Sequence, residues 1–205
     1  YRHWRDPTLP FARAVMAPAH GVVITSASLR DTSDDEMRDW RTAEDRLGTP
    51  HLPLPALRAA VPSPFDYKAN TRVFIVTDVK REAADQVAAA YRELFLASRG
   101  GGLGLFTAIR RLRDVHKRIA RPLEEAGIPL YAQHVDGMDT ATLVDIFRAE
   151  EDACLLGTDA VRDGVDVPGR SLRLIVFDRV PWPRPDILHK ARKQSFRLAA
   201  APGEA

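Results

Sequence analysis

Short apolar runs alternate along the chain with longer segments in which apolar residues recur at helical spacing. The short runs predict β-strands, at residues 22–25, 72–77, 103–106, 129–133, 153–156 and 174–177. The longer segments predict α-helices, at residues 84–95, 108–126 and 140–150. Strands that alternate with helices in this way indicate an α/β fold, in which a mostly parallel sheet carries helices on both faces.

Turn and capping signals mark several of these boundaries. The three glycines at 100–102 predict the end of the first helix. Asp139 predicts the N-cap of the third helix. The stretch from Arg30 to about Pro64 is first polar and charged and then rich in proline, which favours a connection between domains over a packed element.

Composition restricts the kinds of protein and site. A chain of 205 residues with 45% hydrophobic residues is long enough for about one to two domains with a buried core. The formal net charge is only +2, so affinity for nucleic acid must come from local clusters of cations. The single cysteine excludes an internal disulfide and any multi-cysteine metal or iron–sulfur site built from this chain alone. Cys154 is interpreted as a small core residue.

Neither a membrane segment nor a metal site is predicted. The sequence has no apolar run long enough to cross a bilayer and no charged-then-apolar leader, so we expect a cytoplasmic protein with no membrane partner. The six histidines show no metal-ligand spacing, and each is interpreted as a surface or packing residue.

The loop at 157–169 constrains function most. It joins two predicted strands and carries one threonine and three aspartates between glycines. At the carboxyl edge of an open α/β sheet, such a loop lies where these sheets bind ligands. Gly164 lets the backbone turn where a side chain would block a nucleotide, Asp166 can accept hydrogen bonds from ribose hydroxyls, and Thr158 can donate one to a phosphate. The alternative stays open that the loop is only a solvated connection, in which the aspartates accept hydrogen bonds from backbone N–H groups of the turns.

The helix at 108–126 is the best candidate for binding nucleic acid. It has an apolar stripe on one face and, on another, cations about one turn apart, at Arg110, Arg113, Lys117 and Arg121. Such cations can follow a phosphate backbone, and the helix N-terminus beside Thr107 offers free N–H groups. We predict that Thr107 and Arg110, nearest to the sheet edge, contact nucleic acid. The distal cations are more typical of a solvated helix face.

Three segments resemble, in the same order, sequence motifs of the DinG/XPD-type superfamily 2 DNA helicases. Residues 22–29 resemble motif III, residues 102–107 resemble motif IV, and the loop at 157–169, with its GVDVPG stretch, resembles motif V. Residues 63–67 and 181–185 are also similar to this family, so the resemblance covers most of the chain. Three partial matches in the family's order are far less expected by chance than any single one.

The resemblance implies a fold, a function and roles for particular residues. The fold would be a RecA-like three-layer α/β/α domain, acting as the second motor domain of an ATP-dependent DNA helicase. ATP and Mg²⁺ would be held mainly by a first RecA-like domain, the partner domain, and single-stranded DNA would cross both. The resemblance assigns Ser26, Ala27 and Ser28 to motif III coupling, Asp163, Gly164 and Asp166 to nucleotide binding, and Thr107, Arg110 and Thr158 to binding single-stranded DNA.

Two positions depart from the family pattern. Asp163 stands where the family usually has glutamate before the GVD sequence, and Ser28 replaces the usual threonine of motif III. Both retain the functional group, although the side chain of Asp163 is one methylene shorter.

Several helicase motifs do not occur in the sequence. There is no G-x-x-x-x-G-K-[ST] phosphate loop, and no Q-x-x-G-R-x-x-R motif VI. The acidic run at 34–36 does not follow an apolar strand, so it is interpreted as solvated and not as a DEAH box. No catalytic set is complete, and we expect the chain alone to be inactive. We further expect a truncated piece, with the end of the first RecA-like domain at 1–30, a connection at 31–70, and the second RecA-like domain, lacking motif VI, at 71–205.

Two other interpretations stay open. A catalytically inactive nucleic-acid-binding or interaction module derived from a helicase would keep the fold without the first domain. A Rossmann-type nucleotide-binding enzyme is less favoured, because no G-x-G-x-x-G follows the first predicted strand.

Overall fold

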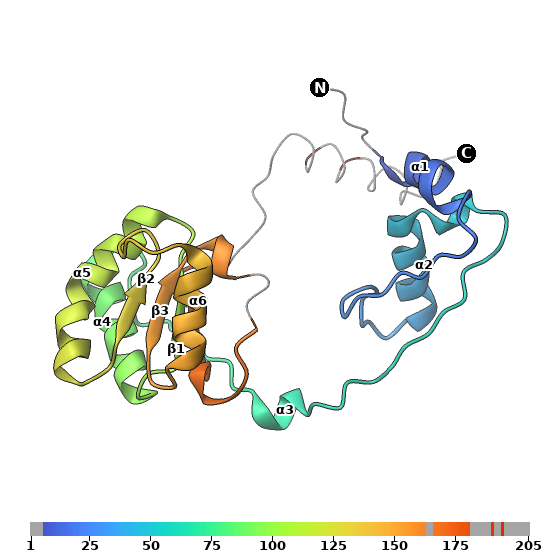
Figure 1. Ribbon diagram of the computed structural model, residues 1–205. Coiled ribbons are helices and arrows are strands. Elements are labelled where there is room, and N and C mark those ends of the chain that lie inside the picture. The colour runs from blue at the N-terminus through green and yellow to red at the C-terminus, as the bar shows by residue number, and fades with distance from the viewer. Residues whose placement is uncertain (1–5, 163–165, 181–189, 191–193, 195–205) are drawn as a thin grey trace. The chain divides into compact units, whose positions relative to one another are not determined.

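The computed structural model describes residues 6–162, 166–180, 190 and 194. Within this part of the chain, the residues up to Thr71, with 190 and 194, belong to one compact unit, and those from Arg72 to Val180 belong to a second (Figure 1). The β-sheet lies wholly in the second unit, so that unit contains the edge at which ligands are expected.

A four-stranded parallel sheet forms the centre of the second unit. Its strands are β1 (Gly102–Leu105), β2 (Leu130–Ala132), β3 (Cys154–Gly157) and β4 (Leu174–Phe177), in the spatial order β2-β3-β1-β4. Gly102 is level with both Cys154 and Leu174, so these strands begin at one edge of the sheet and end at the other. The predicted α/β fold is confirmed, and each of these strands lies within one residue of its predicted position.

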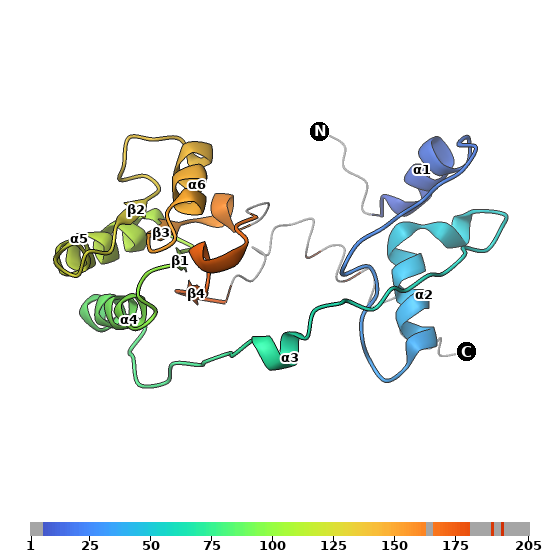
Figure 2. The ribbon, with the colours of Figure 1, turned by 60° about the horizontal axis from the view of Figure 1, so that its bottom comes forward.

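Helices cover both faces of the sheet. α4 (Ala84–Ala97) and α5 (Ile109–Glu125) pack against each other on one face, and α6 (Thr140–Ala149) covers the opposite face (Figure 2). Cys154 and Leu156 of β3 belong to the core beneath α4 and α5, whereas Leu155 belongs to the core beneath α6. Burial on both faces explains why β3 reads as a continuous apolar run.

The helix boundaries follow the sequence signals closely. The carboxylate of Asp139 accepts hydrogen bonds from the N–H groups of Ala141 and Thr142, so the predicted N-cap of α6 is confirmed. The predicted apolar stripe of α5 is buried from its second turn onward, and the exception is Ile109, which is 42% exposed.

Glycines allow α4 to lie close to β1. A Cβ atom at Gly102 would lie 2.7 Å from the ring of Phe95, and one at Gly104 would lie 2.8 Å from the ring of Tyr91. Arg99, Gly100 and Gly101, with φ angles of +54°, +83° and +59°, form the turn that ends α4. The prediction that all three glycines at 100–102 end the helix was therefore wrong for the last of them, which belongs to the strand.

The side chain of Arg173 ties together the loops at the amino edge of the sheet. Its guanidinium donates to the backbone oxygens of Ser98, Glu151 and Arg170, and it pairs with Asp152 at 2.8 Å. It thereby satisfies carbonyl groups at the end of α4 and in the turns before β3 and β4, which have no partner within a helix or a strand.

Two predicted strands do not form. Residues 22–25 and 72–77 have no regular structure, and no described strand pairs with either of them. Most of their apolar side chains are exposed, including Val23 at 92% and Ile75 at 84%. The prediction was wrong at these places because an apolar run becomes a strand only where a neighbouring strand supplies backbone partners.

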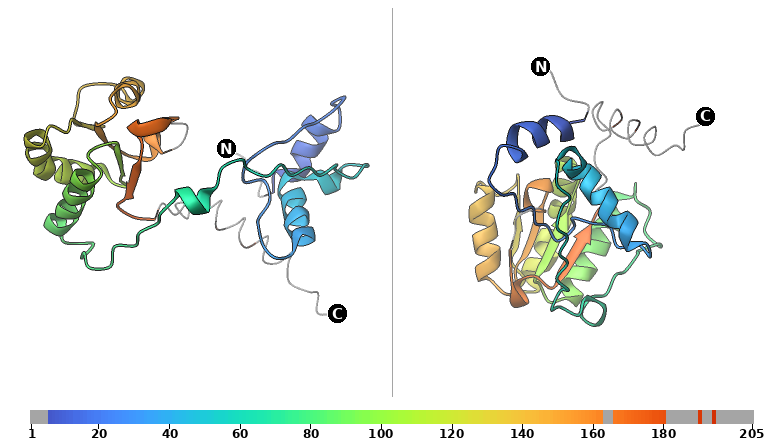
Figure 3. Two further views of the ribbon diagram at one scale, coloured as in Figure 1. Left: turned by 90° about the horizontal axis from the view of Figure 1, so that it is seen from below. Right: turned by 90° about the vertical axis from the view of Figure 1, so that its right-hand side faces the viewer.

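The first unit is built from helices. It contains α1 (Thr8–Phe11), the π-helix η1 (Ala12–Met16), α2 (Glu36–Leu47), the 3-10 helix η2 (Thr49–His51) and α3 (Tyr67–Asn70) (Figure 3). The preference for an unpacked connection at 30–64 missed α2, which is capped by Asp35 and ends at Gly48 with φ +78°. In neither unit is any described helix long and apolar enough to span a membrane.

We predict that Gly104→Ala destabilises the second unit by about 1–2 kcal/mol. The cost of overpacking the core with the added methyl group exceeds the stability that a strand gains when alanine replaces glycine. Tyr91 cannot easily yield, since its ring stacks on that of Phe106 at 4.9 Å and meets that of Phe95 edge-on. Urea unfolding followed by circular dichroism measures the effect. The matched control is Gly137→Ala, where an added Cβ meets no atom within 4 Å; equal unfolding midpoints for the two variants would contradict the packing argument.

Candidate nucleic-acid interface

Each strand of the sheet is followed at its carboxyl end by a polar residue. Gln133 comes directly after β2, Thr158 after β3 and Asp178 after β4, and Thr107 comes after β1 with Phe106 between them. Because the strands are parallel, these residues gather at one edge of the sheet. Their side chains fall into two groups, since Thr107 is exposed and Thr158 half-buried, while Gln133 and the carboxylate of Asp178 are buried.

Thr107 lies next to the N-terminus of α5, which has no side-chain cap. The N-cap residue is Ala108, and the first turn contains no acidic residue. N–H groups at such a terminus carry partial positive charge and favour an anion. Arg110 is exposed in the same turn, and its side chain makes no hydrogen bond or ion pair among the described residues. Both predicted residues are thus free to meet a phosphate.

A small hollow brings Thr107 and Thr158 together between the ends of β1, β3 and β4. The remaining polar residues of its lining are Asp159, Arg162 and Arg179. Asp159 and Arg162 pair with each other at 3.1 Å, so the carboxylate reduces the positive charge at this place. The geometry favours a ligand that hydrogen-bonds to hydroxyl groups and approaches the start of α5.

Gln133 was not predicted as part of the site, although it holds Thr158 in place. Its Oε1 atom accepts hydrogen bonds from the backbone N–H of Thr158 at 3.0 Å and from the Thr158 hydroxyl at 2.8 Å. Its Nε2 atom donates to the hydroxyl of Thr140, the first residue of α6, at 2.8 Å. The sequence signal that would have found Gln133 is a polar residue at the end of a predicted buried strand.

The buried carboxylate of Asp178 and the half-buried Arg111 form a second polar group that the sequence analysis missed. The Asp178 side chain is 1% exposed and accepts a hydrogen bond from Nε of Arg111 at 2.8 Å. These hydrogen bonds raise the pKa of Arg111 above its ordinary value, so the guanidinium stays charged. Arg111 also donates to the backbone oxygen of Arg81, and the pair therefore joins β4, α5 and the segment before α4.

Three more arginines of α5 have partners within the unit, whereas the exposed Lys117, like Arg110, makes no hydrogen bond or ion pair among the described residues. Arg113 donates to the backbone oxygen of His134, Arg118 pairs with Asp85 and Arg121 pairs with Glu125. These contacts agree with the alternative in which the distal cations form a solvated face.

The nucleotide-binding prediction lies only partly within the described residues. Asp163 and Gly164 lie outside them. Asp166 is exposed, and its backbone oxygen accepts a hydrogen bond from Nε of Arg148 at 3.0 Å. The next residue, Val167, is buried in the core beneath α6, which fixes the backbone on which the Asp166 carboxylate stands.

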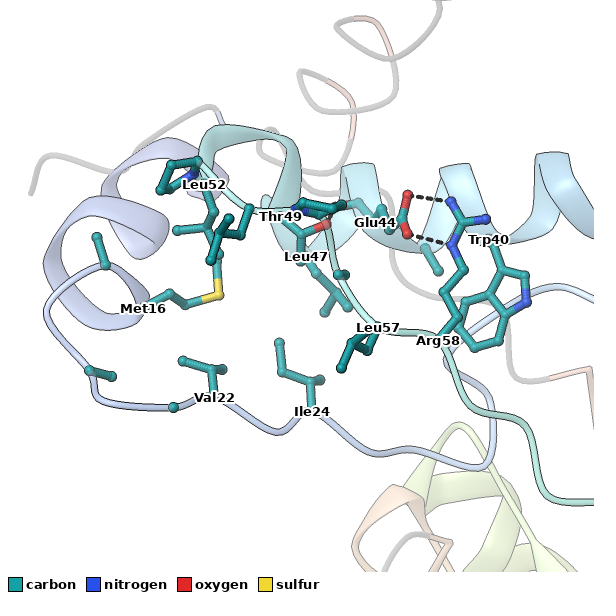
Figure 4. Close-up of a pocket in the computed structure, with 18 of the residues that line it drawn as sticks. Met16, Val22, Ile24, Trp40, Glu44, Leu47, Thr49, Leu52, Leu57 and Arg58 are labelled. Carbon is teal, nitrogen blue, oxygen red and sulfur yellow. Dashed lines mark hydrogen bonds and ion pairs between the residues drawn. The ribbon is translucent and has the colours of Figure 1, made fainter.

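Ser26, Ala27 and Ser28 belong to the first unit. All three are exposed, and the N–H of Ser28 donates to Oγ of Ser26 at 3.2 Å. The preceding residues Val22 and Ile24 line an apolar hollow of about 450 Å³ within that unit (Figure 4). Val22 and Ile24 thus face the hollow and Val23 faces solvent, as in a strand, although no described strand pairs with this segment.

At one side of this hollow Arg58 donates to both oxygens of Glu44, at 2.7 and 2.9 Å (Figure 4). These hydrogen bonds lower the pKa of Glu44 and keep it ionised. No group of three or more His, Cys, Asp or Glu side chains that could hold a metal ion occurs in the described part of either unit.

Comparison with known proteins identifies relatives of the chain. The family model of the helicase C-terminal domain matches residues 91–202. The chain is 33% identical to the ATP-dependent helicase DinG of Mycobacterium tuberculosis over 87% of its own length and 25% of the relative. It is 30% identical to the 3'-5' exonuclease DinG of Bacillus subtilis, over 94% of its own length and 21% of the relative. It is 29% identical to the ATP-dependent DNA helicase YoaA of Escherichia coli, over 86% of its own length and 26% of the relative.

The chain spans about a quarter of the length of these relatives. No solved structure matches it. The helicase resemblance predicted from the three motifs is confirmed by the family model and by these relatives.

We predict that Asp178→Asn destabilises the second unit by about 2 kcal/mol, because it removes charge-assisted hydrogen bonds from a buried pair. The control is Asp85→Asn, whose partner is Arg118 in a pair with side-chain exposures of 90% and 39%. Loss of such a surface pair costs about 0.5 kcal/mol or less. Urea unfolding measures both variants, and equal losses would show that the Asp178 pair contributes no more than a surface pair.

Proposed function

The chain belongs to the family of helicase C-terminal domains, and we propose that it acts as the second motor domain of an ATP-dependent DNA helicase. The observation that carries this proposal is the meeting of Thr107, Thr158 and the uncapped N-terminus of α5 at the carboxyl edge of a parallel sheet. The similarity to the ATP-dependent helicase DinG of Mycobacterium tuberculosis supports it.

Single-stranded DNA is the proposed partner of this edge. A phosphate oxygen would accept hydrogen bonds from N–H groups of the first turn of α5, with the Thr107 hydroxyl beside it and Arg110 providing a charge. Thr158 would contact the strand from the next loop. Contacts to sugar and phosphate carry no sequence information, so binding would not depend on base sequence.

ATP is the proposed cofactor, bound between this domain and a first RecA-like domain. Asp163, Gly164 and Asp166 would face the nucleotide, and the exposed carboxylate of Asp166 fits a role as acceptor for ribose hydroxyls. Mg²⁺ would be held mainly by the first domain, and Ser26, Ala27 and Ser28 would couple the two domains. Binding and hydrolysis of ATP would close and open the cleft and move the DNA strand across both domains.

An inactive nucleic-acid-binding module derived from a helicase remains the second candidate. The pairing of Arg113, Arg118 and Arg121 within the unit favours it, because it leaves few unpaired charges on α5 for a long DNA track. Both candidates bind DNA at the same edge, and they differ in whether ATP hydrolysis occurs once a first motor domain is supplied.

We predict weak, sequence-independent binding of single-stranded DNA, with a salt dependence of about two to four released ions. Arg110→Ala should lower the affinity and reduce the salt slope by about one ion, because it removes one phosphate contact. Fluorescence anisotropy of a labelled oligothymidine over a salt series measures both quantities. The control is Arg121→Ala, an exposed cation already paired with Glu125. If the two variants bind alike, the start of α5 does not contact DNA.

We predict that the chain alone releases no phosphate from ATP, with or without DNA, because it contains no phosphate loop. A phosphate-release assay measures this, with Asp166→Ala as the control for contaminating enzymes. Release that exceeds the buffer blank and disappears in the variant would contradict the assignment of the phosphate-binding residues to another domain.

A further inference from the structure

The amide of Gln133 lies buried between the ends of β2 and β3 and the start of α6. The residue is 5% exposed, and its side chain makes three hydrogen bonds, two to Thr158 and one to Thr140. Its own backbone N–H donates to Leu156 of β3 at 2.9 Å, which continues the sheet pairing by one residue. The side chain therefore projects from a fixed point toward the loop after β3.

The chemistry of the partners fixes the orientation of this amide. The backbone N–H of Thr158 can only donate, so the atom that faces it must be the acceptor Oε1. Nε2 then faces the Thr140 hydroxyl, which accepts. Because Oε1 receives two hydrogen bonds and cannot donate, the Thr158 hydroxyl proton points toward Gln133.

We propose that Gln133 is a positioning residue that presents the Thr158 hydroxyl to a phosphate of single-stranded DNA. This inference rests on the proposed function and adds a mechanism to it. In the free protein the hydroxyl donates to Oε1, and on binding it rotates and donates to a phosphate oxygen. The hydrogen bond from the Thr158 N–H to Oε1 stays in place during this exchange, so the loop does not move.

Two features indicate that the hydrogen bond from the Thr158 hydroxyl to Gln133 can be exchanged for one to phosphate and is not a permanent structural bond. Thr158 is half-buried and lines the hollow that it shares with Thr107, so it borders the place where a phosphate would lie. The exchange also leaves no buried polar atom without a partner, because Oε1 keeps the backbone N–H and Nε2 keeps Thr140. A hydrogen bond to a charged phosphate is stronger than one to a neutral amide, which gives the exchange its direction.

The test is a double-mutant cycle with Gln133→Met and Thr158→Val in the 205-residue chain. Each single variant should weaken binding of labelled oligothymidine roughly threefold to tenfold, as expected for the loss of one hydrogen bond. The double variant should bind no more weakly than T158V alone, since Gln133 acts through the hydroxyl that T158V removes. All three should keep the wild-type salt slope because no charge is lost, in contrast to Arg110→Ala.

Thr140→Val is the matched control. It removes the other hydrogen bond of the same amide and leaves both bonds to Thr158, so affinity should stay within about twofold of wild type. Circular dichroism checks that each variant is folded. Should Q133M not fold, Gln133→Asn replaces it, because the shorter amide cannot reach Thr158 and keeps a polar group.

The possible outcomes separate this inference from the proposed function. If Q133M weakens binding equally with and without T158V, Gln133 is only structural and the inference is overturned. If T158V leaves affinity unchanged while Arg110→Ala weakens binding, the proposed DNA site is supported. Contact of Thr158 with DNA and the positioning role of Gln133 are then both overturned. If neither variant changes binding, the proposed DNA interface itself is wrong.

Discussion

The close approach of α4 to β1 is the constraint on which the second unit depends. Gly102 and Gly104 present no side chain toward the helix, so the rings of Phe95 and Tyr91 pack directly on the backbone of the strand. At this separation the Tyr91 hydroxyl reaches the backbone oxygen of Val176 on β4, at 3.3 Å. Burial raises the pKa of that hydroxyl, so it remains a neutral donor. One helix thus secures both the central strand and its neighbour.

The residues at the carboxyl edge of the sheet are held in place by these packed elements. The polar residues that follow β2 and β4 are buried and bind neighbouring elements. Gln133 hydrogen-bonds to the loop after β3 and to α6, and Asp178 hydrogen-bonds to α5. The residues that follow β1 and β3 are left at the surface of the hollow. Buried polar networks of this kind hold a site rigidly, because each member would leave an unsatisfied group behind if it moved.

Local signals in the sequence were enough for most of the second unit. Apolar runs and helical periods located β1 to β4, α4, α5 and α6, because each of these elements buries a face whose pattern is visible within its own residues. The same reasoning brought Thr107 and Thr158 to one edge of a parallel sheet. It failed at 22–25 and 72–77, where the apolar pattern is present and the strand partner is not.

The residues missed at the site share one property, which is that their partners are distant in sequence. Gln133 and Thr158 are 25 positions apart, and Arg111 and Asp178 are 67 apart. No periodicity links such pairs, and only the strand order brings them together. The helix α2 was missed for a different reason, since it is short of apolar residues and its signals are the caps at Asp35 and Gly48.

The strand β4 has consequences for how the protein behaves in concentrated solution. Its side chains alternate, with Leu174 and Val176 packed against the core beneath α4 and α5 and with Ile175 and Phe177 about half exposed. Among the described residues β4 pairs only with β1, so its other edge carries open backbone groups beside two apolar side chains. Such an edge is a template for pairing between molecules. We therefore expect aggregation of this unit, when it is handled alone, to begin at β4, and a charged side chain at Ile175 is a simple change that would oppose it.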